Sequence, residues 1–123
     1  MSADTAHALI LIGRFLLGAH FFIAGVRNFR SFTAHTVALA ERGVPLPAAA
    51  LAVGLAVQTI GGAMVALGVW PAISAPALIV FTIVATVLFH NFWAFTGAER
   101  VMHTHFTLTN MALCDALLMA AAP

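Results

Sequence analysis

Arg14 and Asp115 are charged side chains set deep inside long apolar stretches of the sequence. An unpaired Arg or Asp near the bilayer centre costs roughly 2.5–3.5 kcal/mol on insertion scales, and an opposite charge nearby reduces that cost. Arg14 lies seven positions after His7 and Asp115 seven positions before Ala122, so at ~1.5 Å per residue both are expected about 10 Å below one membrane face. We therefore expect a buried ion pair. The alternative is that Arg14 extends to the headgroups while Asp115 is protonated.

Histidines form a second group of side chains that could bind a ligand, a haem or a metal ion. His90, His103 and His105 are expected near one membrane face, with His20 somewhat deeper and Asn110 near the middle. A haem held by His20 and His90 is one interpretation, but their expected depths differ and no haem-specific motif is present. A metal site combining His90 with the "MHTH" segment is another, but no dedicated ligand spacing supports it.

The third interpretation is a pocket for a quinone headgroup or a similar lipid-borne molecule. Histidine and asparagine can bond carbonyl or hydroxyl oxygens, and histidine exchanges protons near neutral pH. Phe89, Phe92 and Trp93 would wall the ring. The residues expected to bind such a ligand are Arg14, His20, Gln58, Thr86, His90, Trp93 and Asn110.

Helical spacing predicts which of these side chains share a face. The first apolar run carries one stripe at spacings of three and four, formed by Arg14, Gly18, Phe21, Gly25 and Asn28. In the second run Gly54, Gly61 and Gly68 repeat every seven residues. Small residues at such spacing let helices approach closely in membranes, so Gln58, which lies among them, is expected to face a partner helix.

A row of polar residues also follows the third apolar run, at Thr82, Thr86 and His90, with Trp93 next on the same side. Threonines at this spacing often only bond back to carbonyls of their own helix. Tryptophan near a helix end is also typical of the membrane interface. The row is therefore compatible with a ligand site but does not require one.

The elements that must position these residues follow from the composition. Of the 123 residues, 63% are hydrophobic and only 7% are charged, and the mean hydropathy is +1.05. A soluble domain of this size could not bury so much apolar surface, so the expected environment is a lipid bilayer. The net charge of +1 comes with scattered arginines, which disfavours a nucleic-acid partner. The lone Cys114 provides neither a disulfide nor a paired metal motif.

Four apolar runs are each near the ~20 residues that a helix needs to cross the hydrocarbon. They cover roughly residues 7–29, 48–69, 72–95 and 104–122. Because isolated strands would leave backbone groups unpaired in lipid, the expected fold class is all-α, an integral membrane four-helix transmembrane bundle in a single domain over 1–123. Residues 30–44 are polar enough for a short amphipathic helix along the interface.

The arginines predict an orientation in the membrane. Arg27, Arg30 and Arg42 lie in the first connection and Arg100 lies in the third, whereas the second connection and both termini carry no lysine or arginine. The positive-inside rule then places those two connections in the cytoplasm and both termini on the extracytoplasmic side. We expect a multi-pass protein of a bacterial-type inner membrane.

The chain resembles the DoxX family of small four-helix membrane proteins from about Leu9 to Met119. The segments that carry the resemblance, in order, are "GRFLLGAHFFIAG" (13–25), "RGVPLP" (42–47), "IGGAMVALG" (60–68), "TIVATVLFHNFW" (82–93) and "FTLTNMALCDALL" (106–118). The family is named for membrane subunits associated with terminal quinol oxidase and thiosulfate:quinone oxidoreductase systems. The resemblance therefore implies a role near the quinone pool.

By position, the family's opening-helix arginine corresponds to Arg14, its closing glycine to Gly25, its helix-three histidine to His90 and its helix-four asparagine to Asn110. This sequence also departs from the family's pattern.

Relatives usually have a glutamate where this chain has Gln58, and a lysine where it has Arg27 followed by Asn28. Thr109 replaces an expected lysine, and Asp115 stands where relatives tend to have glycine. The buried acid is therefore expected to have moved from the second helix to the fourth.

Two functions of different classes follow as expectations. The first is a small membrane subunit of, or accessory to, a quinone-linked oxidoreductase, with an intramembrane site for a quinone headgroup. The sequence has no flavin, nicotinamide or iron–sulfur motif, so any electron transfer would need a partner's cofactor or the quinone itself. The alternative is a non-catalytic structural or assembly subunit of a larger complex, whose polar core fixes helix register. A protein partner or a homo-oligomer is expected in both cases.

Overall fold

The computed structural model describes all 123 residues as a wholly helical chain without strands. Its elements, in order, are α1 (Ala3–Arg30), α2 (Phe32–Glu41), α3 (Pro47–Ala66), α4 (Pro71–Phe89), a 3₁₀ turn η1 (Phe92–Ala94) and α5 (Gly97–Ala121). The predicted all-α class is confirmed. The predicted four-helix bundle is not, because the chain forms five α-helices.

The ends of the helices follow from local sequence. The side chain of Ser2 caps α1 by accepting a hydrogen bond from the backbone N–H of Thr5. Pro47 and Pro71 occupy the first turns of α3 and α4, where a missing N–H costs nothing. Gly68, which follows α3, has a φ of 69°, a conformation that glycine adopts without strain. Gly68, the last of the three glycines spaced seven residues apart, therefore lies in a turn and not in a helix interface.

Glycines hold α1 directly against α3. A Cβ added at Gly18 would overlap the backbone of Gly62 and Ala66, and one added at Gly62 would overlap the backbone of Gly18 and Phe22. The two backbones thus touch without intervening side chains, as small residues permit in membrane helices. This places the predicted stripe of α1 on α3.

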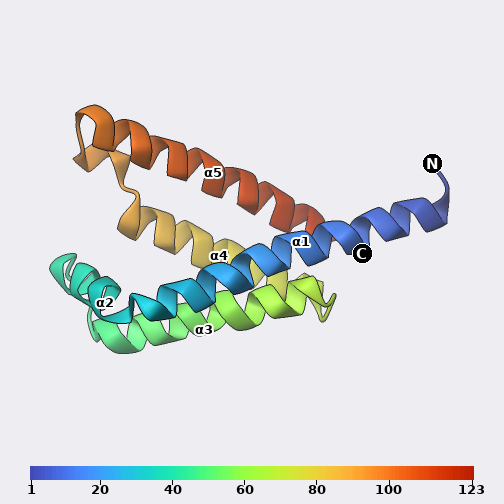
Figure 1. The fold of residues 1–123 in the computed structure, drawn as a ribbon, viewed down its shortest axis with the longest axis horizontal. Helices are drawn as coiled ribbons and strands as arrows, with labels where there is room; N and C mark the ends of the chain where they lie inside the picture. Colours follow the sequence, from blue (N-terminus) through green and yellow to red (C-terminus); the bar gives the residue numbers. More distant parts are fainter.

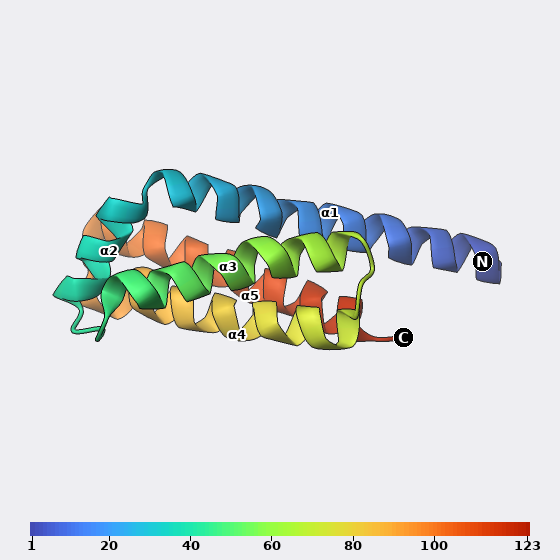
Figure 2. The ribbon, with the colours of Figure 1, turned by 90° about the horizontal axis from the view of Figure 1, so that it is seen from below.

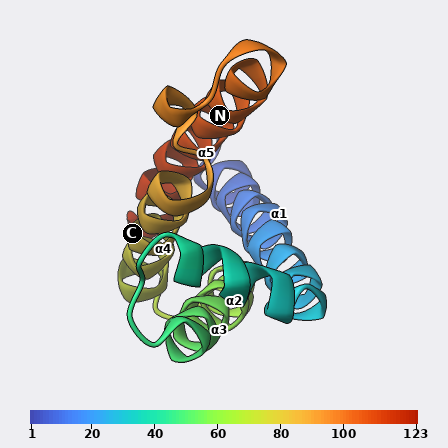
Figure 3. The same cartoon turned by 90° about the vertical axis from the view of Figure 1, so that its left-hand side faces the viewer.

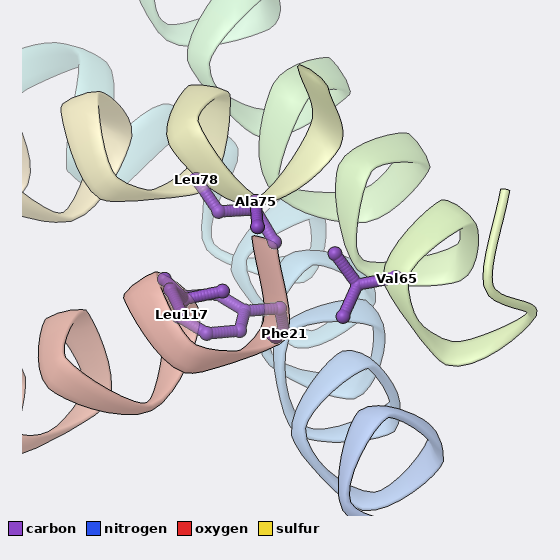
Figure 4. Close-up of a cluster of buried hydrophobic side chains, with 6 residues drawn as sticks. Phe21, Val65, Ala75, Leu78 and Leu117 are labelled. Atoms are coloured by element: carbon purple, nitrogen blue, oxygen red, sulfur yellow. The ribbon is translucent and has the colours of Figure 1, made fainter. Parts of the chain in front are cut away.

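One end of the molecule has a closely packed apolar core. Phe21 of α1, Val65 of α3, Leu78 of α4 and Leu117 of α5 meet there, and the last three are fully buried. Figure 4 shows these side chains, with Ala75 beside Leu78, converging from the four long helices. All four helices are therefore fixed to one another at this end.

The other end is more open. Helix α5 packs along α4, and α1 packs along α3, whereas α1 and α5 have few contacts. Those described join Arg14 and Phe21 of α1 to the last turns of α5. Figure 1 shows α5 running away from α1 toward η1, and the view along the bundle in Figure 3 shows the wide angle between them. Figure 2 shows the N-terminal part of α1 extending past the end of α5. The short α2 lies across this end, where Leu39 packs on Leu51 and Leu55 of α3. A cavity lined by all four long helices lies at this end.

Three helical segments are long and apolar enough to cross a membrane by length and composition. They are Ala3–Arg30, Pro47–Ala66 and Pro71–Ala94. Many of their large apolar side chains point outward, including Ile12, Val53 and Ile83, each more than half exposed. The helix formed from the predicted fourth span, α5, does not meet this criterion, and it carries Glu99, Arg100 and Asp115.

The glycine contact predicts a specific loss of stability. Gly18→Ala should lower the free energy of unfolding by about 1–3 kcal/mol, because the new methyl group overlaps the backbone of α3. Gly13→Ala is the matched control on the same helix, since a Cβ there meets nothing within 4 Å. It should change stability by less than about 1 kcal/mol. Unfolding by SDS titration from mixed micelles measures both. Equal effects of the two variants would show that α1 does not approach α3 in this way.

Candidate functional site

A cavity of about 420 Å³ lies between the long helices at the open end of the molecule. Its polar lining comes from every surrounding element, namely His20 and Asn28 of α1, His35 of α2, Gln58 of α3, Thr82 of α4, His90 after α4, and Asn110 of α5. Phe21, Phe81 and Phe89 form aromatic walls. The cavity thus combines several hydrogen-bonding groups with flat apolar surfaces.

Asn28 and Gln58 connect α1 to α3 on one side of this cavity. The Asn28 Nδ2 donates to Gln58 Oε1 over 3.0 Å, and Gln58 is 5% exposed. The prediction that Gln58 faces a partner helix is confirmed. This bond uses the Gln58 oxygen and leaves its Nε2 with no acceptor in the protein. Gln58 therefore has a donor available at the cavity wall.

Asn110 and Thr86 connect α5 to α4 on the facing side. The Asn110 Nδ2 donates to Thr86 Oγ1 over 2.9 Å, and the Thr86 hydroxyl itself donates to the carbonyl of Thr82. The Thr82 hydroxyl likewise donates to the carbonyl of Leu78. Both threonines therefore bond back to their own helix. Asn110 Oδ1 has no donor in the protein and is an available acceptor.

His90 lies at the end of the cavity and pairs with a second histidine. Its Nδ1 is 3.1 Å from Nδ1 of His103, so one of the two rings donates to the other. His103 stacks on Phe95, with ring centroids 4.2 Å apart. The hydroxyl of Thr107 lies within donating distance of two carbonyls, that of His103 on its own helix at 2.9 Å and that of His90 at 3.1 Å. The Nδ1 contact leaves His90 Nε2 as the ring nitrogen free for another partner.

The predicted ion pair between Arg14 and Asp115 does not form in the structure. Arg14 Nε donates to the carbonyl of Ala120 over 3.1 Å, and its Nη2 donates to the carbonyl of Ala122 over 2.6 Å. Asp115 is exposed and borders a separate groove between α4 and α5. The depth estimate was wrong because α1 begins at Ala3 and extends past the end of α5, which brings Arg14 level with the last residues of the chain.

The structure brings together four of the seven residues predicted to bind a ligand, which are His20, Gln58, His90 and Asn110. Thr86 does not line the cavity, but its hydroxyl accepts the hydrogen bond from Asn110 Nδ2. Arg14 lies at the packed end, outside the cavity. Trp93 is 61% exposed on η1, because α4 ends at Phe89 and the helical row does not continue to it.

Asn28, His35 and Phe81 are among the lining residues that sequence reasoning did not assign to a ligand. Asn28 was recognised only as a member of the α1 stripe, and that stripe was the available signal. His35 lies on α2, which folds back over the cavity. The His35 ring contacts the Phe89 ring edge to face. Phe81 carries no polar atom, and nothing in its spacing distinguishes it from core.

No three His, Cys, Asp or Glu side chains are grouped so that they could hold a metal ion. His90 and His103 are brought together, whereas the aromatic neighbour of His105 is Phe106, next to it in the chain. His20 and His90 both line the cavity.

Comparison with known proteins gives one match. The family model described as DoxX matches residues 9–91, which span α1 to the end of α4 and include all of the cavity's lining except that from α5. No curated protein and no solved structure matches the chain.

The hydrogen bonds of Arg14 predict that substitutions at Arg14 and at Asp115 have independent effects on stability. Arg14→Gln should lower stability by removing hydrogen bonds to the two C-terminal carbonyls, by roughly 1.5–3 kcal/mol. Asp115→Asn should not alter that loss, because the two side chains do not contact. A double-mutant cycle followed by SDS unfolding should therefore give a coupling energy below about 0.5 kcal/mol. A coupling energy well above that value would show that Arg14 and Asp115 do form an ion pair.

Proposed function

The chain belongs to the DoxX family of small membrane proteins, and from that premise we propose that its cavity binds the headgroup of a quinone or a similar lipid-borne molecule. In this role the protein is a small membrane subunit of, or accessory to, a quinone-linked oxidoreductase. The observation that supports the proposal most is the convergence of His20, Gln58, His90 and Asn110 on one aromatic-walled cavity inside apolar helices.

The hydrogen-bonding groups of the cavity fit both redox forms of such a ring. A quinone carbonyl accepts hydrogen bonds, and the free Nε2 of Gln58 supplies a donor. A quinol hydroxyl donates, and the free Oδ1 of Asn110 supplies an acceptor. Asn28 and Thr86 hold these two amides in the required orientation. Phe21, Phe81 and Phe89 offer faces and edges for packing against a ring.

The paired histidines provide a route for protons. Quinone chemistry couples electron transfer to proton uptake and release, and imidazole exchanges protons near neutral pH. His90 lines the cavity, and its Nδ1 contacts His103, which is half-buried on α5 beside Phe95. A proton accepted by His90 at Nε2 can therefore leave through the shared Nδ1 contact toward the end of the molecule. Electrons would be supplied by a partner protein, since the chain itself has no redox cofactor motif.

Access from the bilayer is consistent with the angle between α1 and α5. These helices both border the cavity but have few contacts with each other. A headgroup attached to an apolar tail can therefore enter between them from the side while the tail stays in lipid. In this proposal α5 completes the membrane domain as a fourth crossing, and the protein resides in a bacterial-type inner membrane with both termini extracytoplasmic.

A second function, as a structural or assembly subunit, is favoured by Asp115. This carboxylate is exposed, makes no ion pair within the chain, and lies on a helix that is less apolar than the other three long helices. A charged group in that position is costly in lipid but can pair with a basic side chain of another membrane subunit. The open groove beside it, bordered by Cys114 and Met111, gives such a subunit a place to pack.

Quinone binding predicts a selective effect of the cavity amides. Gln58→Leu should weaken binding of a short-chain ubiquinone analogue by roughly three- to tenfold, because one hydrogen bond to the ring is lost. Titration of purified protein in neutral detergent, followed by isothermal calorimetry, measures the dissociation constant. Trp93→Leu is the matched control, since Trp93 is exposed outside the cavity. Equal binding by wild type and Gln58→Leu, or no saturable binding by wild type, would contradict the proposal.

The assembly function predicts a different result. Asp115→Leu should release any stoichiometric partner that co-purifies with the wild type, because the partner's cation loses its counter-charge, while quinone binding is unchanged. Native mass spectrometry of the gently solubilised protein counts the subunits. A wild-type preparation that contains the chain alone would argue against this second function.

A further inference from the structure

A second polar pocket lies at the open end of the molecule, where α1 ends and α2 begins. It has a volume of about 490 Å³ and is lined by Ala24, Arg27, Asn28, Arg30, Ser31 and His35. We call it the basic pocket. Ala24, Asn28 and His35 also line the inner cavity, so the two spaces are neighbours that share a wall.

The arginines of the basic pocket have no anionic partner within the chain. The protein has only four acidic residues, and none of them lines the pocket. Neither Arg27 nor Arg30 donates a hydrogen bond to the protein, in contrast to Arg14 and Arg42, which both donate to backbone carbonyls. Arg27 and Arg30 are three residues apart on one helix, so their like charges repel each other. An anion bound between them would relieve this repulsion.

The basic pocket lies where the C-terminus of α1 meets the N-terminus of α2. Helix α2 starts directly after Ser31, and the Ser31 side chain makes no capping hydrogen bond. The first turn of α2 contains no acidic residue, and the last turn of α1 carries Arg27 and Arg30, so the two helix ends at Ser31 contribute partial charges of opposite sign. The Ser31 hydroxyl and the Asn28 and His35 side chains offer further polar groups around the space. Two guanidinium groups, a hydroxyl and an imidazole form a set suited to phosphate oxygens.

We propose that the basic pocket binds a phosphate group, carried by an anionic membrane lipid or free in solution. Arg27 and Arg30 neutralise its charge, and Ser31 and His35 bond the remaining oxygens. Arg27 and Arg30 do not line the inner cavity, whereas His35 borders both spaces. A lipid bound here would lie beside the inner cavity, against the shared wall formed by Ala24, Asn28 and His35.

The test uses the full-length protein in phosphatidylcholine nanodiscs that contain a minor fraction of phosphatidylglycerol. Phosphatidylglycerol is net anionic, whereas the choline of phosphatidylcholine opposes the arginines. Native mass spectrometry should find one phosphatidylglycerol retained per wild-type chain, and Arg27→Gln with Arg30→Gln should reduce retention by at least about tenfold. Arg100→Gln is the matched control, because it removes an exposed arginine from α5 outside the pocket. It should retain the lipid.

A second arm distinguishes the two sources of phosphate. If inorganic phosphate at millimolar concentration displaces the lipid from the wild type, the site recognises the phosphate group alone. If the lipid stays, the site requires the lipid. Loss of binding in the Arg27→Gln, Arg30→Gln variant supports the proposal in both cases, provided that its thermal unfolding matches that of the wild type. Equal lipid retention by this variant and the wild type, or equal loss in Arg100→Gln, would overturn the proposal.

Discussion

The direct contact between the backbones of α1 and α3 is the constraint on which the rest of the structure depends. Hydrophobic burial does not drive helices together inside lipid, so close packing and interhelical hydrogen bonds must do so. Gly18 and Gly62 remove the side chains that would keep the two helices apart. The same approach brings Asn28 within hydrogen-bonding distance of Gln58. One close contact therefore both joins the helices and orients the amide that borders the cavity.

The position of α1 also determines where the molecule is closed and where it is open. At the packed end, Phe21 joins Val65, Leu78 and Leu117 in the core, and the Arg14 side chain ties α1 to the last carbonyls of α5. Toward the other end α5 follows α4 away from α1, and the space between them is the cavity. A polar cavity thus arises inside an apolar protein because two helix pairs diverge from a common packed end. The proposed ligand site and the proposed phosphate site both lie at the divergent end.

Sequence reasoning predicted the helices well, because apolar run length and the Pro and Gly residues between the runs act locally. The predicted short helix at 30–44 corresponds to α2, and the family resemblance is confirmed over residues 9–91. The stripe on α1 pointed to the correct face, since its glycines contact α3. Four of the predicted ligand residues line the cavity together, although their expected depths in the membrane differed.

The failures share a physical cause, which is that depth and helix rotation depend on where each helix begins. The depth of Arg14 was counted from His7, but α1 begins at Ala3 and extends beyond α5. The Arg14 side chain therefore meets the carbonyls of Ala120 and Ala122 and not Asp115. Trp93 was placed by extending a helix that ends at Phe89. His35 reaches the cavity only because α2 folds back across the open end, a tertiary contact that no local pattern predicts.

Photocrosslinking with an azido-quinone analogue tests the central claim most directly, namely that a lipid-borne headgroup occupies the space between the diverging helix pairs. The labelled protein is digested, and the modified peptides are mapped by mass spectrometry. Labels on the inward faces of α1 between residues 20 and 28 and of α5 between residues 110 and 113 are the predicted result. Labels confined to the outer apolar groove between α3 and α4, where Val53, Val57 and Val80 lie, would contradict it.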